Sequence, residues 1–306
     1  MLSNYKGKYY MVNYEKLSRK NIQQLIGDDR DHAINTIDKR KSKAPLVREY
    51  VKYYTQGLLT PIEQLKQNGF VHLGSLMSQM DASNIRNYLF DNQFVYHAHI
   101  PVYANDMKTF VRNEQDILQM PNGTYSFTGD VILKHPLIQN LIINPSICNL
   151  AQSYLGAAPT FYDCNAICNV YNGQNQNIDA SQQIHRDKED FKSLTMLVYL
   201  NDTDIHTGSH LYQVGSHLKD DPEGDFVALT GKAGTAFFED GFGQHFGKPL
   251  DQAGYRIILW FRYGYYANAM YEDTNKLWQY KIDKSEFEKH IPMNDFNNYL
   301  LRLFIK

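Results

Sequence analysis

Apolar residues recur along the chain with two different spacings, and the change between them predicts where helices and strands lie. In the segments 61–68, 81–90 and 130–156 apolar positions recur at the spacing of helices. Between residues 160 and 266 short apolar runs alternate with turn-rich segments, a pattern typical of strands. After residue 266 the helical spacing returns. The pattern therefore predicts a mainly β fold with flanking helices.

Capping residues indicate where the predicted helices begin and end. Thr60 is suited to cap a helix that starts at Pro61, Glu63 lies three residues after the cap, and Gly69 ends the helix before a short strand. A second helix is predicted over residues 81–90. Further helix boundaries are predicted at Pro136, Pro145 and Gly156.

The predicted strands are short and numerous, which favours an antiparallel sandwich or barrel. They cover residues 161–171, 194–200, 227–229, 234–238 and 255–263. We therefore expect a helical extension at 1–58, a core at 59–266 and a helical C-terminal buttress at 267–306, packed together as one compact domain.

Composition narrows the function classes. A net charge of −2 argues against a global attraction to nucleic acid or membrane, and a small molecule is the expected partner. The sequence has no 18-residue apolar run, no apolar stretch at its start and only three cysteines, so a reducing cytoplasm is the expected setting. Residues 1–58 are basic, which is typical either of an anion-binding patch or of a solvated helix face. We favour the second, because no aromatic interleaving accompanies the charge. Nothing in the sequence indicates the oligomeric state.

Three residues form a candidate metal site. His185 and Asp187 are an H-x-D pair in strand-like surroundings, and side chains two apart on a strand point the same way. His245 lies 60 residues later (245 − 185) and is the candidate third ligand. Two histidines and one carboxylate form the facial triad of non-heme Fe(II) oxygenases, which leaves coordination positions open.

Arg256 follows His245 by 11 residues (256 − 245). The residues between them include proline, aspartate and glycine, a composition typical of a turn between two strands. A hairpin there would place Arg256 beside the metal site. Its guanidinium suits a carboxylate ligand, because the planar fork donates two parallel hydrogen bonds.

This ordered set resembles the phytanoyl-CoA dioxygenase family of Fe(II)- and 2-oxoglutarate-dependent oxygenases. The segments that carry the resemblance are His185 to Asp187, residues 207–217 with their two Gly-Ser-His motifs, Gly241 to His245, and Arg256. The resemblance extends over residues 61–266 and makes the β region an oxygenase domain. It implies a double-stranded β-helix core, a cupin-like jelly roll with the metal in its mouth.

The resemblance also implies a reaction. Fe(II) held by His185, Asp187 and His245 would be chelated by 2-oxoglutarate, whose far carboxylate pairs with Arg256. O₂ would complete the site, and a C–H bond of a small or medium-sized metabolite would be oxidised with succinate and CO₂ as co-products. Halogenating members have Gly or Ala in place of the carboxylate, so Asp187 favours hydroxylation or another oxidation. No sequence feature selects a substrate.

Two nearby positions bear on the cosubstrate. Gln183 lies two residues before His185, so on a regular strand it faces the metal, and family members often have Gln there, close to the cosubstrate. A surface Gln is the alternative. Family members also often have a hydroxyl residue two positions after the distal histidine. This chain has Gly247, which leaves the second anchor of the far carboxylate unassigned.

Other polar motifs have simpler interpretations. The residues Ser209, His210, Ser216 and His217 are expected to be structural, through turn hydrogen bonds. The H-x-H pair at residues 97 and 99 has no carboxylate at a useful spacing, and we expect two ordinary histidines.

Two other functions remain compatible with the motifs. A regulatory jelly roll could retain the triad and sense 2-oxoglutarate without turnover. A cupin-like metal isomerase would share the barrel but has no need of Arg256.

Overall fold

The computed structural model describes residues 2–5, 8–11, 60–96, 108–110, 117, 119–127, 129–173, 180–187, 190, 192–219, 224–264 and 282–306. The H-x-H pair, the expected domain boundaries near 58 and 266, and all of the basic segment except residues 2–5 and 8–11 lie outside these residues. Within them, no helix has both the length and the apolar character needed to cross a membrane.

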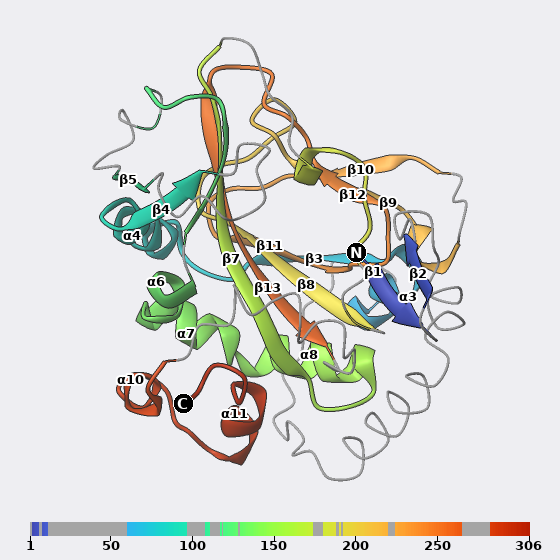
Figure 1. Ribbon diagram of the computed structural model, residues 1–306, viewed down its shortest axis with the longest axis vertical. Coiled ribbons are helices and arrows are strands. Elements are labelled where there is room, and N and C mark those ends of the chain that lie inside the picture. Colours follow the sequence, from blue (N-terminus) through green and yellow to red (C-terminus); the bar gives the residue numbers. More distant parts are fainter. Residues whose placement is uncertain are drawn as a thin grey trace.

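Two antiparallel sheets form the centre of the molecule (Figure 1). The larger sheet has the strand order β3-β11-β8-β13-β7-β6-β4-β5, and the smaller has the order β10-β9-β12. The larger sheet consists of β3 (Phe70–Ser75), β11 (Thr235–Asp240), β8 (Ser193–Tyr199), β13 (Gly254–Gly264), β7 (Thr160–Tyr171), β6 (Gly123–Phe127), β4 (Gln93–Tyr96) and β5 (Lys108–Phe110). The smaller sheet consists of β10 (Phe226–Leu229), β9 (His210–Gln213) and β12 (His245–Gly247).

The long strands are buried on both faces, and alternate residues supply two separate cores. On β8, Met196 and Val198 belong to the core beneath the helices, whereas Leu197 and Tyr199 belong to the core between the sheets. Because successive side chains of a strand point to opposite faces, one continuous apolar run can supply both cores. These two facing sheets are the jelly roll, or double-stranded β-helix, expected from the sequence.

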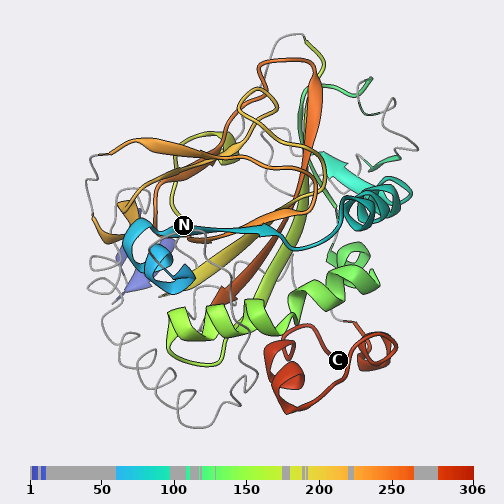
Figure 2. The same cartoon turned by 180° about the vertical axis from the view of Figure 1, so that it is seen from behind.

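Helices cover the face of the larger sheet that is turned away from the smaller sheet (Figures 1 and 2). They are α6 (Gly129–Leu133), α7 (Pro136–Ile142) and α8 (Pro145–Leu155), followed at the C-terminal end by α10 (Lys284–Glu288) and α11 (Asp295–Leu300). Pro136 and Pro145 open their helices and Gly156 ends α8 in a left-handed conformation, as predicted. The C-terminal segment packs on β7, where the rings of Phe304 and Phe161 lie 5.0 Å apart.

The first described helix has the predicted boundaries. In α3 (Pro61–Asn68) the Thr60 hydroxyl accepts from the Glu63 backbone N–H, and the Glu63 carboxylate accepts from the Thr60 N–H at 2.7 Å. Gly69 follows with a φ of 85°, so the chain turns directly into β3. The second helix, α4 (Gln79–Phe90), begins two residues before the predicted start, because Ser78 provides an earlier cap.

The smallest element is a two-stranded hairpin of β1 (Leu2–Tyr5) and β2 (Lys8–Met11). It forms a sheet of its own, so it adds no strand to either sheet of the jelly roll.

The turn between β11 and β12 is tightly packed at Gly243. A Cβ atom there would lie 1.8 Å from the hydroxyl oxygen of Tyr212, a fully buried residue whose hydroxyl donates to the Asp240 carbonyl at 2.9 Å. We expect Gly243→Ala to lower the free energy of unfolding by about 1–3 kcal/mol, because a buried ring has to move. Chemical denaturation measures this change.

Gly254→Ala is the matched control, because a Cβ atom at Gly254 would meet nothing closer than 3.9 Å. The control should unfold at the wild-type midpoint or slightly above it. Equal midpoints for the two variants would contradict the packing argument.

Candidate metal centre

The two histidines of the predicted triad face each other across a short antiparallel bridge. The His185 N–H donates to the His245 carbonyl and the His245 N–H donates to the His185 carbonyl, both at 3.0 Å. Two residues on, the Asp187 N–H donates to the Gly241 carbonyl at 2.7 Å. The H-x-D segment therefore lies beside residues 241–245, and residues 60 positions apart in the sequence become direct neighbours.

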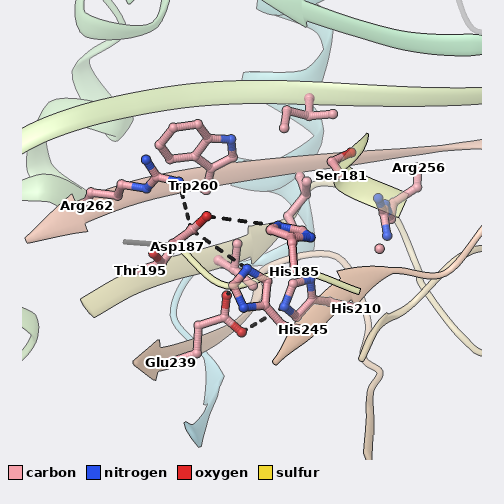
Figure 3. Close-up of a pocket in the computed structure, with 14 residues that line it drawn as sticks. Ser181, His185, Asp187, Thr195, His210, Glu239, His245, Arg256, Trp260 and Arg262 are labelled. Carbon is pink, nitrogen blue, oxygen red and sulfur yellow. Dashed lines mark hydrogen bonds and ion pairs between the residues drawn. The ribbon is translucent and has the colours of Figure 1, made fainter. Parts of the chain in front are cut away.

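The three side chains converge on one point (Figure 3). His185 Nε2 lies 4.0 Å from Asp187 Oδ1, and His245 Nε2 lies 3.8 Å from Asp187 Oδ2. One ligand atom from each residue lies within 4.8 Å of the others, so the three side chains are close enough to hold a single metal ion.

Both imidazole rings are oriented by the chain itself. His185 Nδ1 lies 2.7 Å from the Gln183 carbonyl oxygen, and His245 Nδ1 lies 3.0 Å from the Gly243 carbonyl oxygen. A carbonyl only accepts, so each Nδ1 carries the hydrogen and each Nε2 offers a lone pair to the centre. Burial lowers the pKa of His245 to about 4, which keeps this ring in the neutral form that binds metals.

The Asp187 carboxylate is held as an anion by Arg262. Arg262 Nη2 lies 2.7 Å from Asp187 Oδ2, and its Nη1 lies 3.5 Å from Asp163 Oδ2. Burial alone would raise the pKa of Asp187, but the positive charge of Arg262 outweighs it and keeps this pKa well below its usual value. Arg262 also lies over the Trp260 ring, 4.5 Å from its centroid. The donor set is thus two neutral imidazoles and one carboxylate, which suits Fe(II).

The triad opens into a cavity of about 180 Å³. Alternate residues of β13 form one wall, because every second side chain of a strand faces the same way: Arg256, Ile258, Trp260 and Arg262. Ile167 and Leu197 add apolar surface from β7 and β8. The cavity therefore combines the polar metal end with four apolar side chains and two arginines.

Arg256 lines the cavity as predicted, but the route predicted for it is wrong. No hairpin joins His245 to Arg256, because β12 pairs with β9 in the smaller sheet while β13 pairs with β7 and β8 in the larger one. The connection crosses between the sheets. Arg256 is 4% exposed and donates to the Gly208 carbonyl and the Asn169 side-chain oxygen. These bonds fix the guanidinium at a cavity wall.

Gln183 does not lie where strand alternation predicted. Its side chain is exposed and it does not line the cavity; it contributes its carbonyl, which orients His185. The physical reason is local. Ala180–Gln182 is a turn of 3₁₀-helix, and only His185 forms a β-bridge, so the alternation of a regular strand does not extend back to Gln183.

The Gly-Ser-His motifs divide into structural residues and one cavity residue. The Ser216 hydroxyl accepts from the Gln244 N–H at 2.7 Å, and the His217 ring lies 3.2 Å from the Lys66 carbonyl oxygen. His210 differs, because it lines the cavity and its Nε2 lies 2.7 Å from Glu239 Oε2. Glu239, which our sequence analysis missed, is 1% exposed, and its Oε1 lies 4.0 Å from His245 Nε2.

Burial sets the protonation preferences of this second pair. It raises the pKa of Glu239 to about 7 and lowers the pKa of His210 to about 3, with Arg256 adding to the second effect. Two sequence signals were missed: the acidic residue directly after the apolar run of β11, and the period-2 positions that place Trp260 and Arg262 on the same face as Arg256.

Comparison with known proteins finds similar structures but no similar sequence family. No family model and no curated protein matches the sequence. The structure is similar to that of the epimerase SnoN in complex with Fe³⁺, alpha ketoglutarate and nogalamycin RO, with 17% identity and a TM-score of 0.50 over 67% of this chain and 82% of that chain. It is also similar to the carbocyclase SnoK from nogalamycin biosynthesis, with 18% identity and a TM-score of 0.48 over 70% of this chain and 87% of that chain. A third similar structure is HygX from Streptomyces hygroscopicus with nickel and 2-oxoglutarate bound, with 14% identity and a TM-score of 0.47 over 67% of this chain and 87% of that chain. At such identities the likeness to SnoN shows a shared fold.

Proposed function

We propose that this protein is a non-heme oxygenase that depends on Fe(II) and 2-oxoglutarate and oxidises a C–H bond of a small or medium-sized metabolite. One observation carries the proposal. Two histidine Nε2 atoms and one carboxylate, all oriented from within the chain, converge on a cavity that also holds a buried arginine. The three donors on one side leave positions open, and the arginine provides a charge for an acidic cosubstrate.

Each residue has a distinct role in this proposal. His185, Asp187 and His245 hold the metal, and the carbonyls of Gln183 and Gly243 keep the two rings in the metal-binding tautomer. Arg262 orients the Asp187 carboxylate by donating a hydrogen bond to Asp187 Oδ2.

Arg256 binds the far carboxylate of 2-oxoglutarate. It is placed for this role because its own bonds to Gly208 and Asn169 hold the guanidinium at the cavity wall. The apolar side chains of Leu197, Ile258 and Trp260 exclude water around the bound molecules. When bound, Fe(II) and 2-oxoglutarate supply the activation of O₂, with succinate and CO₂ as co-products.

Two further observations support the proposal. The structure of SnoN, with a similar fold, holds Fe³⁺ and alpha ketoglutarate, so the fold can accommodate both groups. Asp187 supplies the carboxylate whose loss would leave a position for a halide, and we therefore propose hydroxylation in preference to halogenation.

The proposal is tested by anaerobic titration of the protein with Fe(II) and then 2-oxoglutarate. We expect the weak visible charge-transfer band of a 2-oxoglutarate chelate in the wild type and its loss in His245→Ala, which removes one donor. Admission of O₂ should then release succinate. Iron binding without the band would contradict the proposal, and a band without succinate at any substrate would favour a 2-oxoglutarate sensor.

A further inference from the structure

The cavity has no room for a side chain at the position where a hydroxyl anchor was expected. Gly247 lines the cavity at the end of β12, and a Cβ atom there would lie 2.6 Å from Arg256 Nη2. A serine or threonine at this position would therefore collide with the guanidinium. In this chain the second donor for a carboxylate on Arg256 has to come from another residue.

The residue paired with Gly247 across the smaller sheet is His210. In the register of β9 and β12, the Cα atoms of His210 and Gly247 are direct partners. Side chains of such a pair lie on the same face of the sheet, so the His210 side chain lies on the face of the smaller sheet on which a side chain at position 247 would lie. Arg256 also donates to the carbonyl of Gly208, two residues before His210, so the guanidinium is bonded to the segment that leads into β9.

The His210 ring is oriented by Glu239. Glu239 Oε2 lies 2.7 Å from His210 Nε2, and in Figure 3 the ring lies between this carboxylate and Arg256. The two nitrogens of an imidazole ring lie on different edges, so the bond to Glu239 leaves Nδ1 for another partner. Within the described part of the chain, Nδ1 has no hydrogen-bond partner, although His210 is 8% exposed.

We propose that His210 is the second anchor of the cosubstrate, donating from Nδ1 to the far carboxylate beside Arg256. This inference rests on the proposed function. The bond to Glu239 uses Nε2, so Nδ1 is the ring nitrogen left to donate to an anion held by Arg256. Arg256 provides the charge and His210 a directed hydrogen bond in place of the missing hydroxyl. His210 is thus a binding residue for the cosubstrate, and Glu239 is the residue that positions the His210 ring.

The test compares two keto acids in the anaerobic, Fe(II)-loaded protein. 2-Oxoglutarate and 2-oxobutyrate chelate iron with the same keto acid group, but only the first has a far carboxylate. We expect His210→Gln to raise the Kd of 2-oxoglutarate about 10-fold or more, the loss expected for one hydrogen bond to a charged group. The Kd of 2-oxobutyrate should stay within about 2-fold of the wild type, because that ligand does not reach His210.

His210→Asn is the matched variant. The asparagine amide nitrogen occupies nearly the place of Nδ1, whereas the glutamine amide nitrogen occupies nearly that of Nε2, so we expect the asparagine variant to stay within about 3-fold of the wild-type Kd for 2-oxoglutarate. Equal weakening of both keto acids, or equal affinities of the two variants for 2-oxoglutarate, would overturn the proposal. Failure of the wild type to bind 2-oxoglutarate would instead contradict the proposed function, so the two failures are distinguishable.

Discussion

Asp187→Asn is expected to remove Fe(II) binding and 2-oxoglutarate turnover together. The carboxylate is the one anionic donor of the triad, and the remaining donors are two neutral imidazoles. Losing an outer partner of a metal ligand costs about 10–100-fold in affinity, so losing the charged ligand itself should cost more than about 100-fold. Anaerobic Fe(II) titration and succinate release measure the two effects.

Stability has to be separated from metal binding in this variant. Neutralising Asp187 also weakens its contact with Arg262, both side chains being mostly buried, and we expect a loss of about 1–3 kcal/mol in the free energy of unfolding. Thermal unfolding shows whether the variant is folded at the assay temperature.

Asp163→Asn is the matched control, because Asp163 is the other carboxylate beside Arg262 and is not part of the triad. It should perturb the same arginine and yet lower Fe(II) affinity by less than about 10-fold. Wild-type turnover in Asp187→Asn, or an equal loss in both variants, would count against the ligand assignment.

Arg256→Met is expected to raise the Kd of 2-oxoglutarate by about 100-fold while leaving Fe(II) affinity nearly unchanged. The guanidinium provides a positive charge at the proposed cosubstrate end of the cavity, and charge-assisted hydrogen bonds are roughly twice as strong as neutral ones. The metal ligands come from other residues, so the metal should still bind. Titration of the Fe(II)-loaded variant with 2-oxoglutarate under anaerobic conditions measures this separation.

The control for this experiment is Arg86→Met. Arg86 is partly buried and, like Arg256, donates to a backbone carbonyl, that of Leu200 at 3.1 Å, but it does not line the cavity. It should therefore lose some stability without any change in the Kd of 2-oxoglutarate. If the Arg256 variant bound 2-oxoglutarate as tightly as the wild type, the anchor role would be wrong; if the Arg86 variant weakened equally, the effect would be general destabilisation.

Local chemistry made the helix ends predictable. The cap at Thr60, the reciprocal bond of Glu63 and the left-handed Gly69 act over a few residues, so each can be derived from the sequence alone. The start of α4 was placed two residues too late because Ser78, outside the apolar pattern that we used, also caps a helix.

The candidate site was only partly predictable. The H-x-D pair and His245 were recognised as an ordered set, and the structure brings them together. Arg256 reached the cavity by a crossing between sheets and not by the hairpin that its spacing suggested. The prediction that Gln183 faces the metal was wrong, because a short 3₁₀ turn interrupts the strand alternation on which the prediction relied.

The sequence by itself determined the helix boundaries, the mainly β character of the second half and the identity of the candidate metal donors, because periodicity, capping and donor chemistry are local properties. Only the tertiary structure decided which side chains surround those donors. Arg262 meets Asp187, and Glu239 meets His210, because strands that are distant in the sequence pair in one register and face one another across two sheets. Register is a property of paired strands, and no single segment contains it.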